Sequence, residues 1–226
     1  MFDGIPRRYD FLNRLLTLRL DERWRKRAAR ECLANDAGRV LDLCCGTGDL
    51  ALCMARLAGP ATEIHGLDFS ASMLQVASQK AVQKDLGGAI EFIEGDAVDM
   101  KFGDDFFDSV GIAFAFRNLT WRNPICLQAL SEVRRVIRPG GRFVVVETSQ
   151  PSSKVLKAGY RAYLKAVVSP LGGRLSGHRQ AYRYLARSAR DFYTAGEVTA
   201  LLNTAGFPKV DTRKLMGGIA AIHVAS

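Results

Sequence analysis

The sequence is poor in the residues that cross-link small secreted proteins or bind structural metals. It contains five cysteines and three histidines in 226 residues. No two cysteines form a Cys-x-x-Cys pair, which argues against both a disulfide framework and a zinc ribbon. No two histidines have the spacing that places two ligands on one face of a helix. We therefore predict no metal site and expect the chain to fold by burial of apolar side chains.

Long apolar segments are also missing. No run of about 18 apolar residues occurs, so no membrane-spanning helix is predicted. No short apolar segment of the kind found in signal peptides occurs near the start of the sequence. Unpaired cysteines suit a reducing compartment. We expect a cytoplasmic protein, with association to a membrane surface left open, and an organellar location only if a targeting segment precedes Met1.

Acidic residues are outnumbered, because 32 Lys and Arg face 23 Asp and Glu and give a formal net charge of +9. Such a charge suits nucleic acid, an anionic membrane or plain solubility. The first thirty residues hold many of the basic side chains, interleaved with apolar ones. The pattern predicts a basic, amphipathic helical cap over residues 1–36, which lies on a membrane or covers an active site. The alternative is a helix packed on the core with a solvated basic face.

From Arg39 onward, short apolar runs alternate with helical stretches, which is typical of βαβ units and a parallel sheet. The predicted strands are Val40–Cys44, Ile64–Leu67, Ile90–Ile93, Ser109–Phe114, Arg142–Glu147, Lys209–Lys214 and Ile219–Val224. The predicted helices are Asp49–Leu57, Ser70–Lys84, Pro124–Ile137 and Ala195–Ala205, with Ser70 as an N-cap and Gly206 as a C-terminal stop. We predict one α/β domain over residues 1–226, Rossmann-like with seven strands, mostly parallel with an antiparallel last strand, and with a helical insertion over residues 148–194.

A glycine-rich turn follows the first predicted strand, in Asp42-Leu43-Cys44-Cys45-Gly46-Thr47-Gly48-Asp49. Gly46 and Gly48 tolerate positive φ and allow the backbone to approach a ligand closely. Thr47 places a hydroxyl beside the path of that ligand. The two cysteines in the turn have no base nearby, so we expect them to pack rather than react. With Asp68 twenty residues later, the turn by itself also fits the dinucleotide fingerprint of an NAD enzyme.

Carboxylates after the next two predicted strands bear on the choice of ligand. Asp68, which precedes Phe69, has two oxygens for ribose hydroxyls and fits either class of ligand. Asp96, which precedes Ala97, stands where an adenine amino group needs an acceptor, a common feature of methyltransferases. The Arg138-Pro139-Gly140-Gly141 turn and the terminal pair of strands are also typical of methyltransferases. Together these features favour S-adenosylmethionine over NAD.

The predicted acceptor region follows the fourth strand as Ala113-Phe114-Ala115-Phe116-Arg117-Asn118-Leu119. The Asn/Asp-Pro-Pro-aromatic motif typical of enzymes that methylate base nitrogens is absent there. An aromatic-lined loop with one guanidinium, from Arg117, and one amide, from Asn118, suits a planar, oxygenated ring.

The chain resembles the quinone-biosynthesis C-methyltransferases, a class I family that methylates the ring of demethylmenaquinol and of the corresponding ubiquinol precursor. The resemblance extends over nearly the whole chain, and its most distinctive pieces are Phe116-Arg117-Asn118 and Tyr182-Arg183-Tyr184-Leu185. The other matching pieces are Met1-Phe2-Asp3-Gly4-Ile5, Arg8-Tyr9-Asp10-Phe11-Leu12-Asn13, Leu20-Asp21, Trp24-Arg25, Leu41 to Leu50, Gly66 to Ser70, Met73-Leu74, Gly95-Asp96-Ala97, Arg138 to Gly141, Ala205-Gly206-Phe207 and Gly217-Gly218-Ile219.

The resemblance implies S-adenosylmethionine as the cofactor and assigns the residues that bind it. These candidate cofactor contacts are Tyr9, Asp42, Gly46, Thr47, Gly48, Asp68, Phe69, Asp96, Ala97 and Ala113. Relatives often have Ser where this chain has Ala113, so a backbone contact at most is expected there. Relatives commonly have Phe-Gly-Leu-Arg-Asn where this chain has Phe114 to Asn118, so a tighter or more aromatic acceptor pocket is expected.

The implied reaction is C-methylation of a prenylated hydroquinone, which becomes a carbon nucleophile when an ortho hydroxyl loses its proton. A phenol with a pKa of about 10 stays protonated at neutral pH, so the site must favour the phenolate. Arg117 is the candidate for stabilising that charge, and Asn118 for orienting the oxygen. Water, Tyr184 or Asp10 takes the proton, and the sequence leaves this choice open.

A polyprenyl tail lives in a bilayer, so contact with an anionic membrane is also expected. Apolar residues of the insertion either line a channel for the tail or simply pack, namely Tyr160, Tyr163, Leu164, Val167, Val168 and Leu171. No nucleic-acid partner is expected, and a homodimer is left open. Two alternatives remain at this point: a methyltransferase of the same fold that acts on another small molecule or RNA, which the basic charge favours, and an NAD-dependent oxidoreductase or non-catalytic regulator.

Overall fold

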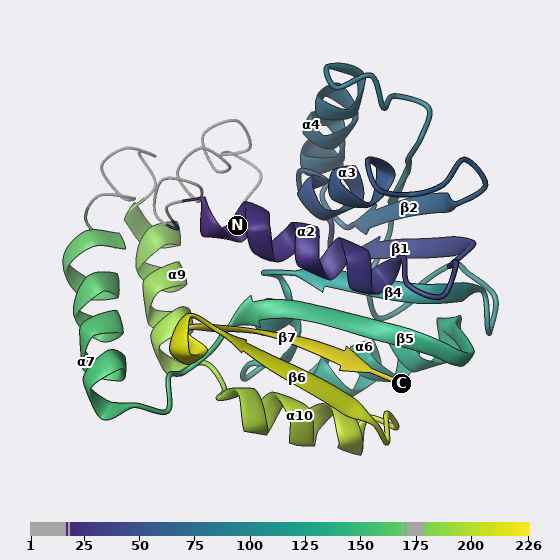
Figure 1. The fold of residues 1–226 in the computed structure, drawn as a ribbon. Coiled ribbons are helices and arrows are strands. Elements are labelled where there is room, and N and C mark those ends of the chain that lie inside the picture. Colours follow the sequence, from purple (N-terminus) through teal and green to yellow (C-terminus); the bar gives the residue numbers. More distant parts are fainter. Residues whose placement is uncertain (1–16, 18, 169, 171–178) are drawn as a thin grey trace.

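A seven-stranded mixed sheet forms the centre of the molecule (Figure 1). The computed structural model describes residues 17, 19–168, 170 and 179–226. The strands are β1 Arg39–Leu43, β2 Glu63–Asp68, β3 Glu91–Glu94, β4 Phe107–Ala113, β5 Ile137–Thr148, β6 Val210–Leu215 and β7 Ala220–Ala225. They lie in the order β3-β2-β1-β4-β5-β7-β6, in which the pairs among β1 to β5 are parallel and β7 is antiparallel to both β5 and β6. The predicted Rossmann-like fold is confirmed.

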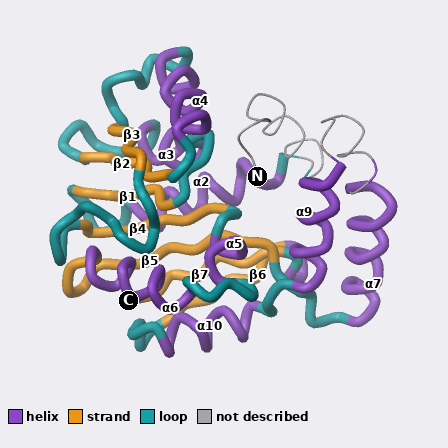
Figure 2. Tube along the Cα trace, turned by 180° about the vertical axis from the view of Figure 1, so that it is seen from behind, coloured by secondary structure: helices purple, strands orange, loops and turns teal. Residues whose placement is uncertain are grey.

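Helices cover both faces of the sheet (Figure 2). They are α2 Leu20–Cys32, α3 Asp49–Ala55, α4 Ala71–Val82, α5 Phe116–Thr120, α6 Cys126–Val136, α7 Lys154–Tyr163, α9 Arg179–Asp191 and α10 Ala195–Thr204, with a π-helical turn η1 Leu164–Val168 and a 3-10 turn η2 Met216–Gly218. Among these described segments, no helix is both long and apolar enough to cross a bilayer.

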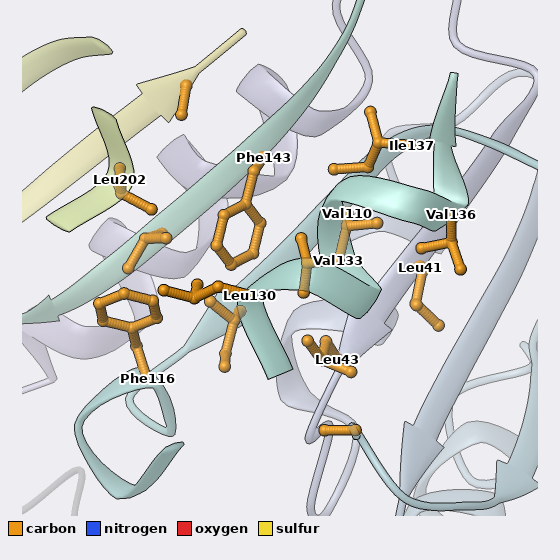
Figure 3. Packing of buried hydrophobic residues seen from close by; sticks show 14 of the residues in the cluster. Leu41, Leu43, Val110, Phe116, Leu130, Val133, Val136, Ile137, Phe143 and Leu202 are labelled. Carbon is orange, nitrogen blue, oxygen red and sulfur yellow. The ribbon is translucent and has the colours of Figure 1, made fainter. Parts of the chain in front are cut away.

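Alternation along the strands divides the core between the two faces of the sheet, because successive side chains of a strand point to opposite faces. On one face, Leu41 and Leu43 pack with the buried faces of α6 and α10 around Phe143 (Figure 3). On the other face, Val40 and Val144 pack with α2 and α3. Both layers are close to fully buried, so the sheet gives the loops at its carboxyl edge a rigid support.

Two predicted helix ends are confirmed, whereas the predicted start of the fifth strand is not. Ser70 caps α4 as predicted, since its hydroxyl accepts from the Met73 N–H at 3.4 Å. Gly206 has φ +92° just after α10, as a C-terminal stop requires. The predicted turn at Arg138–Gly141 falls within the bounds of β5, which begins at Ile137, pairs there with Phe107 and then shifts register so that Arg142 pairs with Ser109. Gly140 has φ +79° in this irregular stretch, so the strand starts before its predicted first residue, Arg142, and contains the glycine turn.

The two segments outside the βα alternation pack differently. Helix α2 packs its small side chains Ala28, Ala29 and Cys32 into the core and leaves basic residues such as Arg23 and Lys26 exposed. Helix α7, turn η1 and helix α9 follow β5 and lie together beyond its carboxyl end (Figure 1). Tyr160 and Leu164 are buried between them.

A buried histidine joins the last two strands to α10. The Nδ1 atom of His223 lies 2.9 Å from the Thr212 hydroxyl, which lies 2.8 Å from the Thr199 hydroxyl of α10. His223 is 1 % exposed, and burial lowers the pKa of its imidazole to about 4 from the usual 6.5. The folded protein thus holds this imidazole neutral at pH values where the unfolded chain protonates it.

This shift predicts a specific loss of stability in acid. Between pH 6.5 and about 4 the unfolded state binds a proton at His223 that the native state does not bind, so the free energy of unfolding falls as the pH falls. The loss reaches about 3 kcal/mol at the acid end of this window. Denaturant unfolding of the wild type and His223→Gln at pH 7, 6, 5 and 4 measures it. The variant should lose less stability than the wild type over this range, and parallel curves would contradict the assignment.

Candidate active site

A cavity of about 970 Å³ opens at the carboxyl edge of the sheet. The ends of β1, β2 and β4 form its floor, while α2, α5 and α7 contribute to its walls. One half is lined by candidate cofactor contacts, namely Asp42, Gly46, Thr47, Asp68, Phe69, Asp96, Ala97 and Ala113. The other half contains Arg117 and Asn118. The structure therefore brings most of the residues predicted from the sequence into one space.

The glycine-rich turn after β1 has the backbone conformation that its sequence predicts. Gly46 and Gly48 have φ values of +54° and +77°. The Gly46 N–H donates to the Asp68 carboxylate at 2.8 Å, and the other oxygen of Asp68 accepts from the Ser70 N–H at 3.0 Å. The carboxylate is thereby fixed between the ends of β1 and β2, beside the cavity.

The two glycines face different surroundings. A Cβ at Gly48 would lie 3.0 Å from the Ala77 Cβ and 3.1 Å from the Phe92 ring, so this glycine lets the turn pack against α4 and β3. A Cβ at Gly46 would meet no described residue within 4 Å. Because Gly46 also lines the cavity, the space above it is available to a ligand that approaches the backbone.

Three carboxylates give the cofactor half of the cavity its chemical character. Asp42 is 1 % exposed, accepts from the Ala51 N–H at 2.8 Å, and has its pKa raised to about 8, chiefly by burial. A cation bound nearby would favour its ionised form. Asp96 is exposed, and both Asp96 and the following Ala97 line the cavity. Beside Asp68, the Phe69 side chain is 68 % exposed and offers an apolar face to a ligand ring.

Thr47 has a partner that the sequence did not indicate. Its hydroxyl accepts from Lys80 Nζ at 3.1 Å, and Lys80 also forms an ion pair with Asp49. Thr47 lines the cavity and is 6 % exposed. Lys80 of α4 thus fixes the orientation of this hydroxyl at the start of α3.

Helix α2 supplies residues of the site that the sequence reasoning missed. Asp21, Trp24 and Arg25 line the cavity. Arg25 is paired with Asp21, lies 4.0 Å from an Asp49 oxygen, and stacks with its guanidinium 4.8 Å from the centre of the Phe114 ring. The i,i+4 spacing of Asp21 and Arg25 was the available signal, but on a helix such pairs are usually solvated.

The thiols of the turn are unreactive in this setting. Burial raises the pKa of Cys44 and of Cys45 well above the usual range, and the nearby carboxylates act in the same direction. Thiolate chemistry needs the opposite shift. Among the described residues, no group of three His, Cys, Asp or Glu side chains is placed to hold a metal ion.

The acceptor segment is a helix rather than the predicted loop. Helix α5 begins at Phe116, whose ring is fully buried against Phe143 in the core, at 6.1 Å between centroids (Figure 3). Phe116 therefore does not line the cavity, and the aromatic contribution of this segment comes from Phe114. The expectation of a more aromatic pocket at Phe116 is wrong, because helical geometry turns that side chain towards α6 and leaves Arg117 and Asn118 at the cavity.

Arg117 is 3 % exposed and held by the end of β5. Its Nη1 donates to Glu147 Oε1 at 3.0 Å and to Thr148 Oγ1 at 2.8 Å, and its backbone N–H donates to Glu147 Oε2 at 3.1 Å. The guanidinium Nε and the Asn118 Oδ1 are buried, and neither has a hydrogen-bond partner in the part of the chain described. Buried polar atoms without partners are costly, which indicates that a ligand or water satisfies them.

The tyrosines that follow β5 differ in whether they line the cavity. Tyr184 lies half-buried on α9 and is not among the described residues that line the cavity, so its role as a proton acceptor stays a prediction. Tyr160 and Tyr163 of α7 do line it, together with Leu164 and Val168. Burial raises the pKa of Tyr160 to about 12, so its hydroxyl remains protonated. The predicted residues Tyr9, Asp10 and Leu171 lie outside the described residues, and Val167 is not among those that line the cavity.

S-adenosylmethionine fits the cofactor half of this cavity. The molecule carries a ribose, an adenine and cationic groups, and the cavity offers a two-oxygen acceptor in Asp68, an exposed ring in Phe69 and a buried carboxylate in Asp42. The open space above Gly46 allows close approach of the ligand to the backbone.

Comparison with known proteins gives consistent matches. The ubiE/COQ5 methyltransferase family model matches residues 1–226. Two curated relatives, both named demethylmenaquinone methyltransferase, come from Thermus thermophilus, at 43 % identity over 99 % of this chain and 98 % of the relative, and from Staphylococcus carnosus, at 38 % identity over 99 % and 90 %. These matches confirm the family resemblance and the cofactor class inferred from the motifs.

Solved structures support the fold independently of these relatives. A SAM-dependent methyltransferase from Aquifex aeolicus matches with a TM-score of 0.58 at 18 % identity, covering 83 % of this chain and 80 % of that one. An O-methyltransferase family protein from Burkholderia thailandensis matches with a TM-score of 0.67 at 16 % identity, covering 96 % and 58 %.

The contrast between the two glycines predicts two different defects. Both Gly46→Ala and Gly48→Ala place a side chain at positive φ, which costs about 1 kcal/mol. Gly48→Ala adds overpacking against Ala77 and Phe92 and should destabilise the fold by roughly 1–3 kcal/mol more. Gly46→Ala should instead lose only the smaller amount of stability but bind S-adenosylhomocysteine more weakly.

Thermal melts and titration calorimetry with S-adenosylhomocysteine separate these effects. If Gly46→Ala bound this ligand as tightly as the wild type, the assignment of the space above Gly46 to the cofactor would be wrong.

Proposed function

Because the chain belongs to the ubiE/COQ5 methyltransferase family and is thus an S-adenosylmethionine-dependent methyltransferase, we propose that it methylates a ring carbon of a prenylated hydroquinone, namely demethylmenaquinol. The observation that carries the proposal is the layout of the cavity. Its lining combines carboxylates near the ends of β1 to β3, the buried Arg117 with the Asn118 amide on α5, and apolar side chains of α7 and η1. A cationic cofactor, a phenolic ring and an isoprenoid chain match these three groups of side chains.

The residues at the centre of the cavity suit activation of a quinol ring. When bound, S-adenosylmethionine supplies a methyl group on a positively charged sulfur. The ring carbon becomes nucleophilic once its neighbouring hydroxyl is ionised, and a phenol with a pKa of about 10 needs help to ionise at neutral pH. Arg117 supplies a buried cation for the phenolate, and the orphaned Asn118 Oδ1 is an acceptor for the second hydroxyl of the ring.

The far end of the cavity suits a prenyl tail. Tyr160, Leu164 and Val168 are buried in a small apolar cluster and line the cavity there. Val155 at the start of α7 and Met216 of η2 also line it, yet they are 83 % and 52 % exposed. The tail leaves the protein past these two side chains, which we call the apolar rim.

Basic residues surround this rim. Lys154 and Lys214 are exposed, Lys157 is half-buried, and Lys214 Nζ donates to Ser152 Oγ at 3.2 Å. Exposed apolar side chains between lysines match an anionic membrane surface, where each lysine contributes about 1 kcal/mol. We assign membrane contact to this rim rather than to the basic face of α2, because α2 packs on the core. The described parts of residues 1–36 and 148–194, namely α2, α7, η1 and α9, then act as covers of the cofactor and the acceptor.

The direct test is a transfer assay under anaerobic conditions. Purified protein with labelled S-adenosylmethionine should methylate chemically reduced demethylmenaquinone, and the oxidised quinone should be inert, because it has no hydroxyl to ionise. RNA serves as the control acceptor. Transfer to RNA with none to any quinol would overturn the proposed acceptor.

Arg117→Ala tests the central charge. The variant leaves Glu147 without its buried partner, so its free energy of unfolding should fall by about 3–5 kcal/mol. The variant must therefore be assayed at low temperature. Binding of S-adenosylhomocysteine should persist, while turnover falls about 100-fold to 1000-fold. Arg138→Ala is the control, since its ion pair with Asp108 lies at the surface. Full turnover in Arg117→Ala would remove this residue from the chemistry.

Charge reversal tests the membrane contact. Lys154→Glu with Lys214→Glu should lower binding to vesicles rich in phosphatidylglycerol by at least about tenfold and leave transfer to a short-tailed quinol unchanged. Lys84→Glu with Lys209→Glu makes the same change of charge at exposed lysines away from the rim. Equal losses in both double variants would mean that net charge alone, rather than the rim, attracts the membrane.

A further inference from the structure

Methylation of a quinol requires a proton acceptor, and the tyrosines of the described cavity wall are poor ones. Burial raises the pKa of Tyr160 to about 12 and raises that of Tyr163 above its usual value. The guanidinium of Arg117 has only hydrogen-bond donors and no acceptor. Among the described residues near Arg117, a carboxylate behind the cavity wall, Glu147, is a further candidate.

Glu147 is 2 % exposed at the end of β5 and does not itself line the cavity. Its Oε1 accepts from Arg117 Nη1 at 3.0 Å, from the Thr148 N–H at 2.8 Å and from the Thr148 hydroxyl at 2.9 Å. Thr148 does line the cavity and is half-buried. One hydroxyl therefore connects the cavity with the buried carboxylate.

The hydrogen bonds that Thr148 makes with described residues leave one position open. Its hydroxyl has one proton and two lone pairs. The proton is donated to Glu147, and one lone pair accepts from Arg117 Nη1 at 2.8 Å. The second lone pair is available to a quinol hydroxyl placed beside Arg117.

We propose that Thr148 and Glu147 form a proton relay for the acceptor, an inference that rests on the proposed function. The quinol O–H proton passes to Thr148 Oγ1 as the Thr148 proton passes to Glu147 Oε1. The products are a phenolate, an unchanged threonine and a neutral glutamic acid. Arg117 exchanges one anionic partner for another, so the buried site keeps its net charge and no ion is created in a medium of low polarity.

The surroundings of Glu147 contain few other titratable groups. Arg117 approaches from α5, and Tyr160 from α7 senses the charges of both Arg117 and Glu147. On β7 the residue paired with Glu147 is Ala221, which does not titrate. The relay therefore predicts that wild-type turnover depends little on the pH of the solution, because the quinol proton stays inside the protein during the transfer.

Thr148→Val is the sharpest variant, since it removes the hydroxyl and keeps both the shape and the Arg117–Glu147 ion pair. Turnover of reduced demethylmenaquinone at pH 7 should fall about 100-fold or more. It should then rise about tenfold per pH unit towards the ionisation of the quinol, because the proton must leave through solution. Thr148→Ser restores the hydroxyl and should recover most of the lost turnover. Thr204→Val, at an exposed position of α10, controls for the substitution itself.

Glu147→Gln is a second test of the relay. It keeps a side chain of the same size but cannot take the proton, so its turnover should also become steeply dependent on pH. A purely structural role would lower the rate equally at every pH. Titration of S-adenosylhomocysteine should be unchanged in all variants and shows that they are folded.

The outcomes separate the two proposals. Wild-type protein that methylates no quinol would contradict the proposed function. Wild-type activity, together with a Thr148→Val variant whose pH profile parallels that of the wild type, would overturn the relay alone.

Discussion

The position of the site depends on a reversal in the order of the strands. The chain runs outward from β1 to β2 and β3, then returns to place β4 on the other side of β1. At such a switch point the connections leave the sheet in opposite directions, and a crevice opens at the carboxyl ends of the strands. The glycine turn after β1, Asp68 at the end of β2 and α5 after β4 all meet in this crevice. The sheet thus brings together residues that lie far apart in the sequence.

The buried ion pair between Arg117 and Glu147 links this crevice to the core. Arg117 belongs to a helix only five residues long, and such a short helix has little stability of its own. Two anchors hold it: the Phe116 ring in the core and the bonds of Arg117 to the end of β5. Within the described part of the chain, the guanidinium Nε has no hydrogen-bond partner. The pair thus fixes the cation in the cavity wall and leaves part of its donor capacity for a ligand.

Much of the fold was predictable from local patterns. Strands β1, β2, β4 and β5 were found because buried parallel strands form short apolar runs, and Ser70 was found because capping residues act locally. Asp68 and Asp96 were found because the first ends β2 and the second follows β3 at one edge of the sheet, and Asp42 because it precedes the glycine-rich turn in β1. Such signals need no knowledge of distant contacts.

The remaining features depend on tertiary contacts. Helix α5 was expected to be a loop, since five residues show too little periodicity to indicate a helix. The sequence pattern places Arg25 on a basic surface, but its contacts with Asp49 and Phe114 orient its side chain towards the cavity. Glu147 ended a predicted strand with nothing to mark it, because its partner lies thirty residues earlier in the chain. Sequence spacing alone does not reveal such pairs.

The most direct test of the account is the quinone content of cells that lack this protein. Lipid extracts of a deletion strain, compared with the parent by mass spectrometry, should contain a quinone lighter by one methyl group, about 14 Da. Expression of the wild-type chain should restore the parental quinone, whereas Arg117→Ala should not. An unchanged quinone profile in the deletion strain would contradict the proposal that this methyltransferase acts on a quinol ring.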